Sequence, residues 1–323
     1  MPGSQYSSIG VYARSVFHLV VAVLLLPVAQ AQDKSAWDWL EQLSRQHRTQ
    51  NYAGVLSFQR DDELHSLHVV HSVFGDQEFE RLDYLDGENR QIVRRAHNVY
   101  CIHPGHRLRG VGGMLLTQQA LESGRLKQSY TAKLDGVGRI GGRDTVSLTL
   151  IPHDTNRFAQ HLSIDRDSGL LVKSEIIGEQ QQVLERIQFA DLEVGGQYSQ
   201  SLFDLDDKAV ELHHPSAEQR KDLGFSWRVG WLPDGFVLTS ENEKKQLQVM
   251  SFTDGLAAVS VFVESLPDNA DGEGGVRNGA TVAYARVLAD GNALYQVTAV
   301  GEVPETTVKR IVESVSLGAG TTQ

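Results

Sequence analysis

Cysteine is almost absent from this chain: Cys101 is the only one among 323 residues, so no intrachain disulfide can form. The fold must therefore be held together by packing. Cys101 lies in the apolar run of residues 99–102, which favours a small buried hydrophobe over a reactive thiol, and we assign it no chemistry. Proline is also scarce, with 8 residues against 30 glycines, which indicates many turns and little disorder.

Motifs for catalysis and nucleotide binding are missing as well. The chain has no Gly-x-Ser-x-Gly elbow, and its glycine-rich segments do not end in the Lys-Ser/Thr pair of a phosphate-binding loop. The glycines at 138–142 are more simply a hairpin turn. Acidic pairs such as Asp61 and Asp62 border expected turns, where Asp bonds to the backbone. We therefore predict no enzyme, no catalytic residue and no cofactor; an unrecognised hydrolase is the weakest alternative.

The spacing of histidines does not indicate a metal site. His65, His68 and His71 are three residues apart, which would align them on a helix. Their setting is typical of a strand, where side chains alternate between two faces and three such rings do not converge. We expect no bound metal.

Long apolar runs are missing except near the start of the chain. Arg14 precedes the apolar residues 16–26, and small residues end the stretch at 29–31, which is the pattern of a secretory signal peptide. The run is too short to cross a bilayer, and no cysteine follows the cut for lipid attachment. We predict a signal peptide over residues 1–31 and a mature protein in an extracytoplasmic space.

The mature chain is acidic. Without residues 1–31 it has 29 Lys and Arg against 41 Asp and Glu, a formal charge of −12. Such a surface disfavours non-specific binding to nucleic acid. It suits a protein that meets a basic peptide or one whose charge simply keeps it in solution.

The first predicted domain, residues 32–200, is mainly an antiparallel sheet. Ser35 and Asp38 have the spacing of a capping box, and Leu40 and Leu43 continue a helical repeat. Residues 107–124 break the strand pattern and indicate a loop leading into a short apolar helix. Alternating apolar residues and turn signals predict strands at 55–58, 67–74, 79–85, 91–94, 146–150, 161–165, 170–177 and 183–189.

The second predicted domain, residues 227–318, follows a linker at 201–226. Asp290-Gly291 is the strongest hairpin signal in the chain, and residues 268–279 are typical of a loop rich in glycine and acid. Val308, Ile311 and Val312 indicate a final helix that closes the sheet. Strands are predicted at 236–240, 246–252, 257–264, 281–288 and 293–300.

Several stretches of this sequence resemble the MucB/RseB family of periplasmic negative regulators of an envelope-stress sigma factor. They cover nearly the whole mature chain and follow one another in the same order as in that family. The stretches that carry the resemblance are residues 85–87, 93–94, 138–143, 152–154, 157–158, 162–170, 231–236, 254–264 and 300–304. The residues between 197 and 221 match poorly.

The resemblance implies an α+β protein. Its N-terminal domain would be an unclosed antiparallel β-barrel, lipoprotein-carrier-like, with helices in the concavity, and its C-terminal domain a smaller β-sheet with a packed helix. It further implies a periplasmic protein that binds the periplasmic part of a membrane-spanning anti-sigma factor and shields it from proteolysis. Lipopolysaccharide or the acyl chains of lipoproteins would release it.

Two sets of candidate site residues follow from this resemblance. The lipid-binding candidates are Val55, Phe58, Phe74, Leu115, Leu116 and Leu121. An ordinary filled core is the alternative for each of them. The partner-binding candidates are Asp254, Phe262 and Glu264. Asp254-Gly255 is also a turn signal, and Phe262 is also a candidate for the core.

Two further hypotheses stay open at this point. A periplasmic lipid or lipoprotein carrier would use the same half-barrel, although a simple carrier needs only the first domain. A homo-oligomer is also compatible with the sequence.

Overall fold

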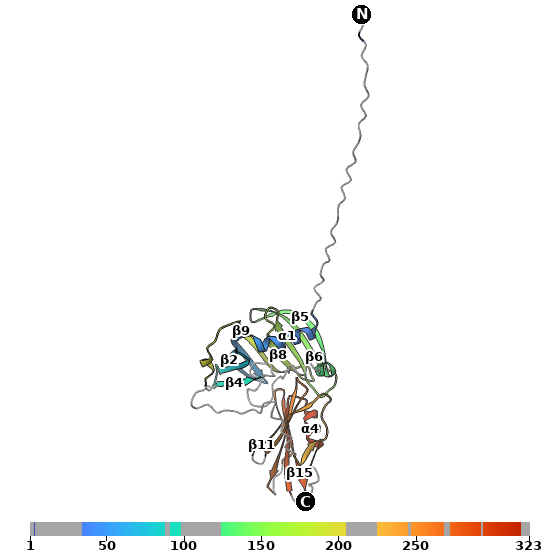
Figure 1. Cartoon of the computed structure of the whole chain (residues 1–323). Helices are drawn as coiled ribbons and strands as arrows, with labels where there is room; N and C mark the ends of the chain where they lie inside the picture. The colour runs from blue at the N-terminus through green and yellow to red at the C-terminus, as the bar shows by residue number, and fades with distance from the viewer. Residues whose placement is uncertain are drawn as a thin grey trace. The chain divides into compact units, whose positions relative to one another are not determined.

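A computed structural model describes Gly3 and residues 34–87, 91–97, 124–204, 225–244, 247–267, 272–291 and 293–317. Residues Lys34–Gln323 form one compact unit (Figure 1). Most of the predicted linker, residues 205–224, lies outside the described residues, and the predicted domain boundaries stay predictions. No helix within the described ranges combines the length and apolar character needed to cross a membrane.

The first helix, α1 (Ala36–Thr49), begins at the predicted capping box. The amide of Asp38 donates to Ser35 Oγ at 3.2 Å, and the amide of Ser35 donates to Asp38 Oδ2 at 2.8 Å. These bonds satisfy donors that a helix start leaves unpaired. Leu40 and Leu43 are fully buried on its apolar side, as the helical repeat predicts.

Nine strands within the described ranges form one antiparallel sheet, the large sheet, in the order β4-β3-β2-β1-β9-β8-β7-β6-β5. β4 and β5 stand at its two ends, so the sheet is not closed into a barrel, as predicted. A short helix, α3 (Arg125–Ser129), precedes β5, and a 3-10 helix, η1 (Gln200–Phe203), follows β9. The strands are β1 (Tyr52–Arg60), β2 (Glu63–Phe74), β3 (Gln77–Tyr84), β4 (Gln91–His97), β5 (Tyr130–Ile140), β6 (Arg143–Pro152), β7 (Ala159–Asp165), β8 (Leu171–Ile177) and β9 (Val183–Val194).

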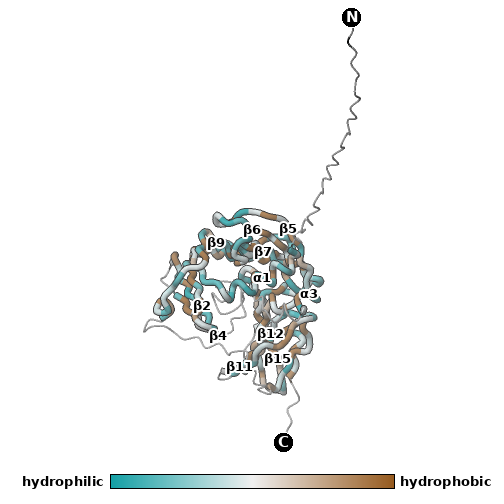
Figure 2. The backbone as a smooth tube through the Cα atoms, turned by 45° about the horizontal axis from the view of Figure 1, so that its top comes forward, coloured by the Kyte–Doolittle hydropathy of each residue, from teal (hydrophilic) through white to brown (hydrophobic). Residues whose placement is uncertain are grey.

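The large sheet has two distinct faces, which we call the helix face and the outer face. α1 packs on the helix face through Leu40 and Leu43, and η1 packs on the outer face through Phe203. Hydrophobic and hydrophilic residues interleave along the strands (Figure 2). Directly paired residues share a face, and one row on the helix face runs through Leu148, Leu162, Ser174, Ile187 and Phe58.

In the second domain, the described residues form a six-stranded sheet, the small sheet, in the order β11-β12-β13-β16-β15-β14. The predicted hairpin at Asp290-Gly291 joins β15 to β16. The expected loop at 268–279 is partly wrong: Gly274–Asn278 form β14, because the free edge of β15 offers backbone partners to a segment of low strand propensity. The elements are β10 (Trp227–Val229), β11 (Val237–Lys244), β12 (Leu247–Thr253), β13 (Ala258–Leu266), β14, β15 (Thr281–Asp290), β16 (Ala293–Gly301), α4 (Glu305–Ser314) and β17 (Val315–Leu317).

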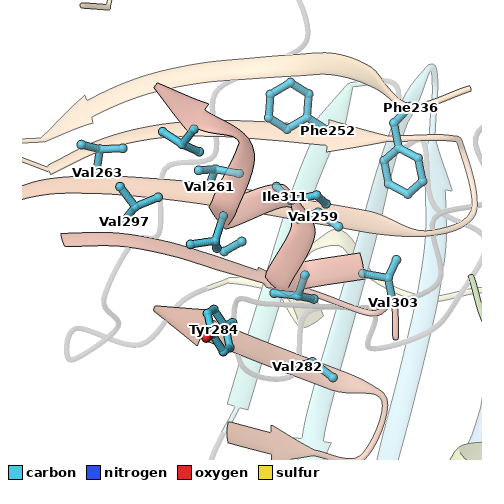
Figure 3. Close-up of a cluster of buried hydrophobic side chains, with 14 of the residues drawn as sticks. Phe236, Phe252, Val259, Val261, Val263, Val282, Tyr284, Val297, Val303 and Ile311 are labelled. Atoms are coloured by element: carbon cyan, nitrogen blue, oxygen red, sulfur yellow. The ribbon is translucent and has the colours of Figure 1, made fainter. Parts of the chain in front are cut away.

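The final helix, α4, covers one face of the small sheet. Val308, Ile311 and Val312 are fully buried and pack against valines of β13 and β16, among them Val261 and Val297 (Figure 3). The structure thus confirms an α+β fold with a large open sheet followed by a smaller sheet that a helix closes.

Candidate functional site

The predicted lipid-binding side chains do not gather on one surface. Phe58 lies on the helix face and is 7% exposed within an apolar cluster. Val55 is three residues away on the same strand and so lies on the outer face. Phe74 also lies on the outer face, where it contacts Phe79 and Phe203. Lipid binding by these three residues stays a prediction. Leu115, Leu116 and Leu121 lie outside the described residues.

Strand β5 exposes apolar side chains on the helix face that the sequence analysis missed. Leu134 pairs with Leu148 and Val137 pairs with Val146, so both lie beside the core under α1. They are nonetheless 39% and 75% exposed. A bulge between Leu134 and Gly136 allows this, because residues three apart would otherwise face opposite ways. The glycine at position 136 is the sequence signal that could have revealed the bulge. Its φ of +140° is one that other residues rarely adopt.

A buried polar group lies on the helix face near the end of α1. Since a carbonyl oxygen only accepts, the Nδ1–H of His71 donates to the carbonyl of Gln50, at 2.9 Å. The ring of His71 stacks on Tyr52 at 4.8 Å, and its Nε2 lies 3.7 Å from a carboxylate oxygen of Glu78. This histidine fixes the connection from α1 to β1.

The three histidines of β2 behave as strand alternation predicts. His65 pairs with Phe58 and His71 with Tyr52, both on the helix face, whereas His68 pairs with Val55 on the outer face. Among the residues that the structure describes, no group of three or more His, Cys, Asp or Glu side chains could hold a metal ion.

Two of the predicted partner-binding residues lie on the face of the small sheet opposite α4, which we call the far face. Val261 and Val263 of β13 point to α4, so Phe262 and Glu264 point to the far face. Phe262 is half-buried and Glu264 is exposed. Register and alternation place further half-buried apolar side chains on this face, namely Leu247, Val249, Val287 and Val300.

The third predicted partner-binding residue, Asp254, is buried and only 1% exposed. Its Oδ2 accepts from Arg157 Nε at 2.6 Å and from the Tyr130 hydroxyl at 3.0 Å, both from the large domain. Its Oδ1 accepts from the amides of Leu256 and Ala257, each at 2.8 Å. The structure therefore gives Asp254 contacts inside the chain, and a direct contact with a partner stays a prediction.

Burial and charge shift the acid–base equilibria around Asp254. Burial and the nearby Asp254 carboxylate raise the pKa of Tyr130 well above its ordinary value. Burial alone would lower the pKa of Arg157, but the charge of Asp254, the nearby Tyr130 and the hydrogen bonds to Asp254 and Asp154 together outweigh burial and raise that pKa. Both groups therefore hold their protons at neutral pH and donate them to Asp254 in hydrogen bonds.

Together these features define a two-domain protein with a large open sheet and a smaller sheet whose far face leaves apolar side chains part-exposed beside Glu264. The family models for the MucB/RseB N-terminal and C-terminal domains match residues 35–210 and 221–316. The chain belongs to the MucB/RseB family.

Individual relatives agree with this assignment. The chain is 30% identical to the sigma factor AlgU regulatory protein MucB of Pseudomonas aeruginosa, over 93% of this chain and 96% of MucB. It is 25% identical to the sigma-E factor regulatory protein RseB of Haemophilus influenzae, over 92% and 96% of the two chains. A crystal structure of MucB in complex with MucA(peri) superposes with a TM-score of 0.71 at 29% identity, over 88% of this chain and all of that one.

Proposed function

We propose that this protein is a periplasmic regulatory binding protein that holds the periplasmic part of a membrane-spanning anti-sigma factor and shields it from proteolysis. The similarity to MucB in complex with MucA(peri) over most of the chain supports this proposal. The names of the curated relatives are those of sigma factor regulators and not of enzymes.

The observation that carries the proposal is the far face of the small sheet. Phe262 and Val249 pair across β12 and β13 and leave apolar surface part-exposed beside Glu264. Interfaces commonly combine a central aromatic anchor with a charged rim. A partner segment with an apolar side chain next to a basic one fits this face, and the acidic balance of the chain favours its approach.

Release of the anti-sigma factor by a lipid follows from the thermodynamic linkage between acyl-chain binding and partner binding. An acyl chain that binds the free regulator better than the complex weakens partner binding by the same factor, and no bond need break. The exposed Leu134 and Val137 on the helix face are the described apolar side chains best placed to meet such a chain.

The test measures the affinity of the mature protein for the periplasmic segment of the anti-sigma factor from its own genome, with and without a soluble acylated ligand. Phe262→Ala should weaken binding about tenfold or more, because it removes a central aromatic anchor. Leu64→Ala, which removes a 63% exposed side chain of the large domain, is the matched control and should leave affinity unchanged. Equal effects of the two variants would contradict the placement of the partner on the far face.

A lipid or lipoprotein carrier is the second candidate function, and the exposed apolar pair on β5 favours it. A carrier would bind an acylated ligand with no affinity for the anti-sigma segment. Val137→Asp should then weaken ligand binding while Phe262→Ala does not.

A further inference from the structure

Two turns of the small sheet are buried against the large domain. The turn between β12 and β13 carries Leu256, and the turn between β14 and β15 carries Ala280. Both residues are fully buried. Leu256 shares a cluster with Tyr130 of the large domain, and Ala280 shares another with Phe158. The two domains are therefore held at two separate points.

The first point, which we call the Asp254 joint, comprises Asp254, Leu256, Tyr130 and Arg157. Arg157 binds more than the Asp254 carboxylate: its guanidinium also donates to the carbonyl of Asp234 and to Asp154, and it lies 5.2 Å from the ring centre of Phe236. One buried cation thus connects the large domain to two segments of the small one. Removing the Asp254 carboxylate would leave this buried cation with the partly exposed carboxylate of Asp154 as its counter-charge.

The second point, which we call the Glu185 joint, has different chemistry. Glu185 Oε1 accepts from Arg60 Nε at 2.8 Å and from the amide of Ala280 at 3.2 Å. Asp61 Oδ2 accepts from the amide of Gly279 at 2.6 Å. Here carboxylates of the large domain hold backbone amides of the small one, whereas at the Asp254 joint a side chain of each domain contributes a charge.

Among the residues that the structure describes, one of the two joints continues into the core under α1 and the other does not. The cluster that contains Leu256 and Tyr130 also contains Leu40 and Leu43 of α1, together with Leu148 of β6. The cluster at the Glu185 joint consists of Phe158, Ile176, Leu184 and Ala280. A displacement of α1 therefore reaches Leu256 through packed side chains, which is the kind of contiguous contact through which coupling passes.

We propose that the Asp254 joint is the coupling element of this protein: it opens when an acyl chain displaces the core under α1, while the Glu185 joint stays closed as the pivot. This inference rests on the proposed function for its partner and its ligand. The opening moves the small sheet relative to the large domain and so changes the affinity of the far face for the anti-sigma segment. Arg157 and Asp254 act as positioning residues in this scheme.

A reversible lock across the joint tests the proposal. A Cβ added to Gly235 would lie 2.8 Å from Ser129 Oγ, which brings the two positions within the reach of a disulfide. Ser129→Cys with Gly235→Cys, in a Cys101→Ser background, should close the joint when oxidised and free it when reduced. The reduced form of the same protein is the matched control.

The locked protein should bind the anti-sigma segment as tightly as the reduced form. Addition of dihexanoyl phosphatidylcholine below its micelle concentration should weaken binding at least tenfold in the reduced form and less than twofold in the oxidised form. Equal weakening in both forms would overturn the proposal.

Hydrogen exchange decides the question without the partner. The amides of Leu256 and Ala257 donate to Asp254, so the same probe should accelerate their exchange in the unmodified chain. The amides of Gly279 and Ala280 at the Glu185 joint should stay protected. Uniform acceleration, or none, would contradict a pivoting joint. A protein that shows this pattern yet does not bind the anti-sigma segment would refute the proposed function and leave the joint intact.

Asp254→Asn provides a second variant whose exchange measurement needs no disulfide, since Gly235 has φ of +87° and a cysteine there is strained. The loss of charge should speed exchange at Leu256 and Ala257 about tenfold without the probe. Asp254→Asn alone should also weaken binding of the anti-sigma segment, because it opens the joint. In the locked background, oxidation should restore the affinity of the unsubstituted protein. Affinity that stays low in the locked form would mean that Asp254 contacts the partner directly and that the joint does not couple.

Discussion

The large and small sheets differ most in what they bury. Eighteen of the 22 buried polar or charged side chains among the described residues belong to the large domain, and four belong to the small one. The core between α4 and the small sheet is built from valines, an isoleucine and aromatic rings. The large domain buries many more polar groups, among them the carboxylates of Asp165 and Glu185, each with a charged partner.

This difference indicates that the two domains are stabilised in different ways, the small one by apolar packing and the large one also by buried polar groups. An apolar core loses dispersion contacts wherever its shape changes, so the small sheet is a rigid platform for a binding face. Buried ion pairs depend on geometry and add little net free energy over apolar packing. The large domain, which would admit a ligand in the proposed function, depends more on such pairs than the small one does.

The largest effect is expected from a cavity in the small core. Ile311→Ala should lower the free energy of unfolding by about 3–4 kcal/mol, because Ile311 is fully buried between α4 and the small sheet. Urea denaturation followed by tryptophan fluorescence measures this loss. Val137→Ala in the large domain is the control; Val137 is 75% exposed, so the loss should stay below about 0.5 kcal/mol. A small effect at Ile311 would mean that the small sheet is not the rigid part.

An intermediate effect is expected from a buried carboxylate of the large domain. Asp165 accepts from Arg143 Nη2 at 2.8 Å and from the amide of Ser168 at 2.9 Å. Burial alone would raise the pKa of Asp165, but these hydrogen bonds outweigh it and hold that pKa below 3.8. Asp165→Asn should therefore cost about 2 kcal/mol at pH 7, since it removes charged hydrogen bonds.

The pH dependence sharpens this second prediction. A carboxyl group whose pKa is lower in the folded than in the unfolded state stabilises the fold above its unfolded pKa, and this contribution disappears as the pH falls through the folded pKa. The stability difference between the native chain and Asp165→Asn should therefore be full at pH 7 and shrink progressively below about pH 4. Urea midpoints at pH 7, 4 and 3 measure the trend. A constant difference would mean that the charge of Asp165 plays no part.

Local signals allowed much of the fold to be predicted. The capping box at Ser35 and the hairpin at Asp290 depend on neighbouring residues alone, and both were found where the sequence indicated. The open order of the large sheet came from the family resemblance rather than from residue patterns.

The candidate site was harder to predict because it depends on distant contacts. Nothing near Asp254 in the sequence indicates that Arg157, 97 positions earlier, would bury its carboxylate. The bulge in β5 likewise brings Leu134 and Val137 to one face although their spacing predicts opposite faces. Val55 is a different case, since strand alternation relative to Phe58 would have assigned it to the outer face.

The smallest effect is expected at the start of α1 and compares the two helices that cover the sheets. Ser35→Ala removes the hydroxyl that accepts from the amide of Asp38 and should cost about 1 kcal/mol. At the start of α4, Pro304 provides no side-chain hydrogen bond, so Glu305→Ala removes only a favourable charge near the helix dipole, worth about 0.3 kcal/mol. Thermal unfolding of both variants measures the contrast. Similar losses would show that the capping box of α1 contributes no more than a single charge at the start of α4.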